Sequence, residues 1–186
     1  MKATKIGLGT IAIAAAAVGW QGAAGAHGFP GPYADNSSHT FVSVEPTESE
    51  FLYWNHFVYF TYVQYGDRTD LTTSERAWND YTATTDVYWY TLDQWAFDMD
   101  YPGVTVHGDS LCVAPMSDNK CDQFRVRFSN AAAATSEANQ WQLVCHEFGH
   151  TLGFDDSIPE PGLGCMSGGG AGWLSDHEIA HINERY

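Results

Sequence analysis

His146, Glu147 and His150 follow the spacing H-E-x-x-H inside an apolar stretch of the chain. Residues four apart lie on one face of a helix, so the two imidazoles can bind one metal ion. Glu147 projects beside that ion, where its carboxylate can take a proton from metal-activated water. Gly153 permits a sharp chain reversal, and Asp156 can then fold back as a third ligand. Three protein ligands with one open position are the pattern of a catalytic zinc.

The same spacing occurs a second time, at His177, Glu178 and His181. This copy lies among charged residues, has no glycine turn, and leaves too little of the given chain after it for a third ligand. We therefore interpret it as a solvated face of a terminal helix and the first copy as the metal site. Within the first copy, Asp155 is an alternative to Asp156 as third ligand.

The residues from His146 to Asp156 match the extended pattern H-E-x-x-H-x-x-G-x-x-(H or D) of metzincin proteases at every fixed position. Met166 follows where that clan has the methionine of its Met-turn. The aspartate ligand and the segment CMSGGG after it resemble the small secreted snapalysin-type proteases of actinobacteria. Gly168 is a departure, because astacin and serralysin relatives have a tyrosine at this place, so no tyrosine ligand is expected.

The resemblance implies a zincin-like fold of the α+β class. It would consist of a twisted mixed sheet with an active-site helix, then a small carboxyl-terminal part with the Met-turn and a final helix. It also implies a zinc endopeptidase acting on protein or peptide substrates, with His146, His150 and Asp156 holding one zinc ion. Glu147 would be the general base, and Met166 an apolar floor under the metal.

Two alternative functions are considered beside the protease. Cleavage after Ala26 would expose His27 as the amino terminus, and an N-terminal histidine with one further histidine can chelate copper, as in lytic polysaccharide monooxygenases. This arrangement would give a copper-dependent oxidase. The other alternative is a non-catalytic binding module that retains a metzincin-like shell. Metal analysis together with a protease assay distinguishes the three.

Residues 1–26 are predicted to be an export signal. Lys2 and Lys5 precede an apolar run that ends at Trp20, and the small residues 24–26 offer a cleavage site. Glycines dilute the run, and no basic stop-transfer cluster follows it, which favours cleavage over a membrane anchor. The protein is therefore expected to be secreted and free of the membrane.

The rest of the chain is expected to form a flexible amino-terminal arm, 27–50, and one catalytic domain, 51–186. Lys2 and Lys5 are the charged residues of the signal, so its removal takes the formal net charge from −15 to −17. So acidic a protein repels nucleic acid and anionic lipid and favours neutral or cationic partners. It is expected to act as a monomer.

The elements around the site are predicted from patterns of apolar residues, capping residues and glycines. Strands are expected at four places in the domain, with a further strand-like stretch in the arm: 51–65, 85–92, 103–107, 123–128 and 41–44. Capping boxes at Thr72 with Glu75, and at Ser175 with Glu178, predict short helices, the first through Trp78 and Tyr81 and the second to the end of the chain. A long helix is expected over 131–151, with an internal start signal at Ser136 and an end at Gly153.

The four cysteines allow three pairings, and spacing alone selects none of them: Cys112, Cys121, Cys145 and Cys165. Export favours disulfides over free thiols. The resemblance implies the pair Cys145–Cys165, because a Met-turn beneath the zinc would draw these two together. The other pair would then be Cys112–Cys121, closing a polar turn. Side chains near that turn offer a candidate calcium site: Asp118, Asn119 and Asp122.

Overall fold

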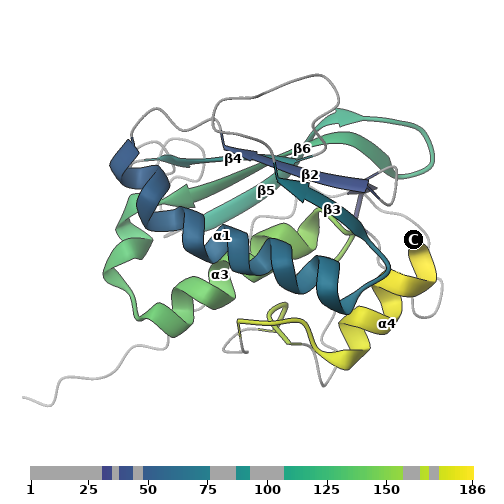
Figure 1. The fold of residues 1–186 in the computed structure, drawn as a ribbon. Helices are drawn as coiled ribbons and strands as arrows, with labels where there is room; N and C mark the ends of the chain where they lie inside the picture. Colours follow the sequence, from purple (N-terminus) through teal and green to yellow (C-terminus); the bar gives the residue numbers. More distant parts are fainter. Residues whose placement is uncertain are drawn as a thin grey trace, which may run out of the picture.

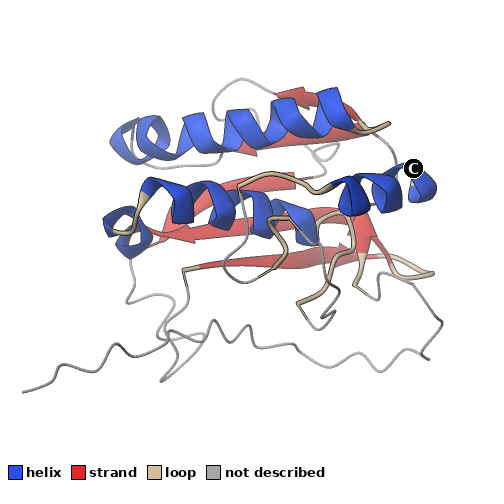
Figure 2. Cartoon of the chain, turned by 90° about the horizontal axis from the view of Figure 1, so that it is seen from below, coloured by secondary structure: helices blue, strands red, loops and turns tan. Residues whose placement is uncertain are grey.

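The computed structural model describes residues 31–34, 38–43, 48–75, 87–92, 107–156, 164–167 and 172–186. It is a mixed α+β fold, in which helices cover one face of a small, open and mainly parallel sheet (Figures 1 and 2). The α+β class expected from the sequence is confirmed. The predicted export signal and His27 lie outside the described residues.

Within the described residues the sheet has six strands: β1 Tyr33–Ala34, β2 Ser38–Ser43, β3 Thr72–Glu75, β4 Val87–Leu92, β5 Gly108–Pro115 and β6 Lys120–Ser129. Parallel pairs join them in the order β1-β6-β4-β2-β3. Strand β5 pairs antiparallel with β6 and, among the described strands, with no other. The sheet thus has one antiparallel edge, and β5 forms it.

Three α-helices and a short 3₁₀ helix complete the described chain: α1 Glu48–Arg68, η1 Asn130–Ala134, α3 Glu137–His150 and α4 Asp176–Arg185. Figure 1 shows α1 and α3 side by side under the sheet, with α4 near the ends of both. Helix α1 links the parallel strands β2 and β3, as such a crossover requires. None of the helices in the described ranges combines the length and apolarity needed to cross a membrane.

Phe128 of β6 lies at the centre of the core between the sheet and the helices. Its side chain is fully buried and stacks on Trp54 of α1, with 5.2 Å between ring centroids and 15° between planes. Its centroid also lies 6.2 Å from that of Phe148 on α3 and 6.1 Å from that of Trp89 on β4. One aromatic ring therefore joins both helices to the two central strands.

The strand predicted for residues 51–65 is wrong, because this segment is the middle of α1. Its buried side chains recur with helical spacing: Trp54, Phe57, Val58, Thr61, Gln64 and Tyr65. The pattern misleads in two ways. Tyr53, Tyr59 and Phe60 are exposed, while the polar Thr61 and Gln64 are buried, so hydrophobicity does not follow the 3.6-residue period.

The helix predicted from Thr72 and Glu75 is also wrong where the structure describes it. Residues 72–75 form β3, whose four residues pair with Ser38 to Phe41 of β2. Thr72 also suits a strand, because threonine is enriched in strands, and pairing with β2 decides between the two structures. Trp78 and Tyr81 lie outside the described residues.

The described parts of the predicted flexible arm, 27–50, belong to the fold. They contain β1, β2 and the first turn of α1, and β2 lies between β3 and β4 in the sheet. The strand expected at 41–44 is confirmed as far as Ser43. A prediction from composition misses this because polar residues can occupy a strand whose backbone pairs on both sides.

Several other expected elements are confirmed. Strand β4 covers the described part of 85–92, and β6 contains 123–128. The long helix predicted over 131–151 is confirmed from its start signal Ser136 to His150, which is α3, but residues 130–134 form the separate 3₁₀ helix η1. The chain reverses at Gly153, whose φ is 97°. The Ser175 capping box opens α4. Of the strand predicted at 103–107, His107 is a bend before β5 and the other residues are outside the described ranges.

The central role of Phe128 can be tested by truncation. Phe128→Ala should lower the free energy of unfolding by about 3–5 kcal/mol, because it removes a fully buried ring and leaves a cavity. Leu111→Ala, at a 45% exposed position on the neighbouring strand, should change it by about 0.5 kcal/mol or less. Urea unfolding followed by circular dichroism measures both, and equal losses would contradict this packing.

Candidate metal centre

Helix α3 carries three of the four predicted site residues on its last two turns. Ser136 caps the helix by accepting a hydrogen bond from the backbone of Asn139 at 3.3 Å. The helix ends at His150, and the positive φ of Gly153 lets the chain turn back towards it. As a result, Asp156 lies beside the two histidines.

The ligand atoms of His146, His150 and Asp156 converge as predicted. The two Nε2 atoms are 3.2 Å apart, and Oδ1 of Asp156 is 2.9 Å from Nε2 of His146 and 3.5 Å from that of His150. Bonds of about 2.0–2.1 Å in a tetrahedron separate ligand atoms by about 3.3 Å. The three donors therefore fit three corners of a tetrahedral metal site, and this group could hold a metal ion.

Backbone carbonyls fix the tautomer of both histidines. Nδ1 of His146 lies 3.2 Å from the carbonyl oxygen of Cys165, and Nδ1 of His150 lies 2.9 Å from that of Phe154. A carbonyl only accepts hydrogen bonds, so each Nδ1 carries a proton, and each ring in its neutral form directs its Nε2 lone pair to the centre. The two Nε2 lone pairs and a lone pair of the Asp156 carboxylate then point to a common centre, where a cation can bind all three.

The electrostatics of the group favour positive charge. Burial lowers the pKa of His146, but the hydrogen bond to Asp156 and the charge of Glu147 outweigh it and raise this pKa to about 9. For Asp156, burial raises the pKa, and the hydrogen bond to His146 outweighs it, so the net shift is downward. Burial lowers the pKa of His150, which favours its neutral, metal-binding form.

Glu147 lies next to the ligand group without belonging to it. Its side chain is buried, with its Cγ 2.9 Å from where a Cβ on Gly108 of β5 would stand. Burial raises the pKa of Glu147 to about 8; the charge of His146 opposes this shift, while Asp109 and Asp156 add to it. A carboxylate with such a pKa can both accept and release a proton near neutral pH.

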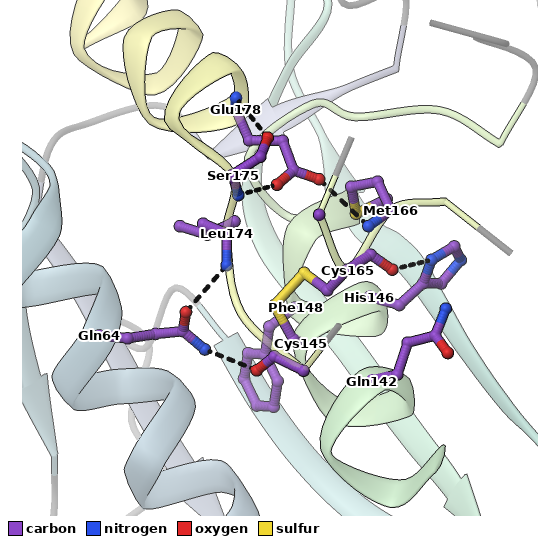
Figure 3. The surroundings of a disulfide bond; sticks show 12 residues. Gln64, Gln142, Cys145, His146, Phe148, Cys165, Met166, Leu174, Ser175 and Glu178 are labelled. Carbon is purple, nitrogen blue, oxygen red and sulfur yellow. Dashed lines mark hydrogen bonds between the residues drawn. A yellow bond between two sulfur atoms is a disulfide. The ribbon is translucent and has the colours of Figure 1, made fainter. Parts of the chain in front are cut away.

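The bridge Cys145–Cys165 ties α3 to the segment around Met166 (Figure 3). The sulfur of Met166 lies only 2.3 Å from where a Cβ on Gly149 would stand, so the absence of a side chain there lets Met166 pack against the ligand helix. Cys112–Cys121 is also formed. Both pairs implied by the resemblance are confirmed.

Glu178 has a structural role that sequence analysis missed. It is fully buried rather than solvated, and its carboxylate accepts hydrogen bonds from the backbone of Ser175 and, at 3.1 Å, of Met166 (Figure 3). The prediction of a solvated face is therefore wrong for this residue. The capping box signalled the bond to Ser175, but nothing in the sequence indicated the bond to Met166.

Two residues of α1 also support the centre from a distance in sequence. Tyr65 donates its hydroxyl to the carbonyl of Cys145 at 3.0 Å. The amide of Gln64 donates to Gly172 at 3.2 Å and accepts from the backbone of Leu174 at 3.0 Å. The strand expected for 51–65 does not place these two side chains near the centre, so the sequence analysis misses them.

The other candidates have different surroundings. His177 and His181 face each other on α4, but no third ligand within the described residues joins them. Asp155 is not part of the ligand group. This favours Asp156 as the third ligand, in agreement with the spacing of the extended H-E-x-x-H pattern. In the candidate calcium site, the amide of Asn119 donates to the carbonyl of Gly31 at 2.8 Å.

No protein-family model matches this chain, and a search of curated proteins returns no match. The geometry of the site is therefore the basis for assigning a function.

The third ligand can be tested by substitution. Asp156→Ala should weaken zinc binding by more than about 100-fold, since loss of an outer-shell partner alone costs about 10–100-fold. Asp155→Ala, one residue earlier in the same turn, should leave the affinity within about threefold of wild type. Competition with a fluorescent zinc chelator measures both, and the reverse order would assign the ligand to Asp155.

The two disulfides should differ in their effect on the metal. Removing Cys145–Cys165 or Cys112–Cys121 by paired Ser substitutions should cost about 3 kcal/mol of stability in each case. Only loss of the first pair should also weaken zinc binding, by about 10–100-fold, because it frees the carbonyl that orients His146. Similar zinc affinities in the two variants, measured where both are folded, would contradict this coupling.

Proposed function

We propose that this chain is a secreted, zinc-dependent endopeptidase of the metzincin type. His146, His150 and Asp156 hold the zinc, and Glu147 is the general base. One observation carries the proposal: three donor atoms lie 2.9–3.5 Å apart beside a buried carboxylate that is not one of them. A structural zinc site uses four protein ligands, whereas a hydrolytic site uses three and keeps a base nearby.

The donor set favours zinc over the common hard cations. Calcium takes six to eight oxygen ligands, and magnesium takes six in an octahedron. Two imidazole nitrogens and one carboxylate oxygen at tetrahedral separations suit zinc. When bound here, zinc supplies a Lewis acid that polarises a carbonyl and acidifies water.

Glu147 performs the proton transfers in the proposed reaction. It takes a proton from the attacking water and delivers it to the amine that leaves when the peptide bond breaks. Glu147 lies against β5 near Gly108 and is buried away from bulk water. Because it belongs to α3 together with His146 and His150, the helix sets its distance from these two residues. Burial raises its pKa to about 8, and the positive charge of a zinc ion bound beside it would oppose that shift and favour the ionised form that accepts the proton.

Strand β5 supports an extended peptide as the substrate. It is the antiparallel edge of the described sheet, and its first residue, Gly108, lies so near the proposed base that a side chain at this position would collide with Glu147. A peptide that adds to such an edge through main-chain hydrogen bonds would pass beside Glu147. Leu111 and Val113 on β5 are exposed and offer apolar contacts to substrate side chains.

Secretion is supported by two features of the chain. Residues 1–26 have the pattern of an export signal, and both disulfides pair all four cysteines. Such bridges persist in oxidising surroundings outside the cytosol.

The mechanism is tested by Glu147→Gln. This variant should bind zinc like wild type and lose at least about 100-fold of its casein-hydrolysing activity, because only the proton relay is removed. Glu184→Gln, at an exposed carboxylate on α4, should retain full activity. Wild type should lose activity with a chelator and recover it with zinc. Activity of the Glu147 variant within tenfold of wild type would refute the assigned role.

A further inference from the structure

The second H-E-x-x-H segment places its histidines in nearly the same mutual geometry as the first. Nε2 of His177 lies 3.2 Å from Nε2 of His181, the separation also found between His146 and His150. The ring centroids are 4.5 Å apart in the second pair and 4.7 Å in the first, with 86° between planes in both. The first pair belongs to a group that could hold a metal ion, and the second pair has the geometry to bind one as well.

The helix that carries the second pair is firmly held. Its amino terminus has the Ser175 capping box, and buried Glu178 binds the backbone of Met166. Asn183 accepts a hydrogen bond from the backbone of Asp70 at 2.7 Å. Two imidazoles on such a helix lose little further freedom when they bind one ion, which lowers the entropic cost of chelation.

The surroundings of the pair suit a cation. His177 is exposed, so an ion can reach it from solvent, and Asp176 precedes it in the sequence. The Glu184 carboxylate lies 3.9 Å from Nδ1 of His181, on the side of the ring opposite Nε2, where a negative charge favours a proton on Nδ1. The net charge of the chain, −15, raises the cation concentration near its surface.

We propose that His177 and His181 form a second metal site, which binds a late first-row transition-metal ion through two imidazole nitrogens. Water completes the coordination, because no third protein ligand within the described residues joins the pair. The site is weaker than the three-ligand centre. It prefers Cu²⁺ to Ni²⁺ and Zn²⁺, since a site of neutral nitrogen donors follows the general order of divalent-ion affinities.

Binding at this site also stabilises the folded chain. The two nitrogens come together only while α4 is helical, so the ion binds the folded state in preference to the unfolded one. An ion present at about 100 times its dissociation constant adds RT ln(1 + [L]/Kd) to the free energy of unfolding, which appears as a higher melting temperature.

The test is equilibrium dialysis of the intact protein against Cu²⁺, with bound metal counted by elemental analysis. His177→Gln should bind one equivalent less than wild type, and His181→Gln should do the same. His56→Gln, at an exposed histidine on α1, is the control and should bind as wild type does. Metal binding elsewhere, including any at the amino terminus, is common to all variants and cancels in these differences.

Two outcomes overturn the proposal: unchanged copper stoichiometry in both His177→Gln and His181→Gln, or a loss in His56→Gln equal to theirs. His146→Gln separates this site from the proposed zinc centre, since it should lose its own equivalent and keep the one on α4. If His146→Gln binds as wild type while His177→Gln loses one equivalent, the zinc centre fails and the second site stands. A copper-induced rise in melting temperature that disappears in His177→Gln supports the site independently.

Discussion

The candidate centre depends on how α3 is joined to the segment 164–167. A helix alone sets the spacing of His146 and His150, but it does not fix the rotation of their rings. The Cys145–Cys165 bridge holds the two segments together, and the carbonyl of Cys165 then lies where Nδ1 of His146 donates its proton. Met166 packs on Gly149 from the same segment, so one covalent link, one hydrogen bond and one apolar contact act on two turns of helix.

Helix α1 extends this constraint to the rest of the molecule. Its inward face carries aromatic residues that pack on the sheet, and near its end Gln64, Tyr65 and Arg68 bind backbone groups of α3 and of the segment before α4. These polar contacts are largely buried, and a buried polar group left without a partner costs about 1–3 kcal/mol. They therefore hold the carboxyl-terminal segment in one position relative to α3. Apolar contacts are less directional and would allow a wider range of positions.

The duplicated H-E-x-x-H segment separates what a motif provides from what its surroundings provide. Both copies form helices and both bring their histidines to the same separation, because the four-residue interval dictates it. The glutamates differ completely. Glu147 lies beside the ligand group near β5, while Glu178 accepts backbone hydrogen bonds that hold Met166 and cap α4. The third ligand also differs, since only the first copy is followed by a described turn that returns a carboxylate.

The sequence by itself determined the features that rest on local rules. The residues that could hold a metal ion, the capped starts of α3 and α4, the turn at Gly153 and strands β4 and β6 all follow from spacing, capping side chains or alternation over a few residues. The resemblance to metzincins added both disulfide pairs. Tertiary structure decided the rest. In residues 51–65, helix formation buries Gln64, whose hydrogen-bond partners Gly172 and Leu174 lie in a distant segment, and 72–75 is a strand because β2 pairs with it. The burial of Glu178 has the same cause: a polar or ambiguous segment takes the structure in which its hydrogen bonds are satisfied, and those partners are remote in sequence.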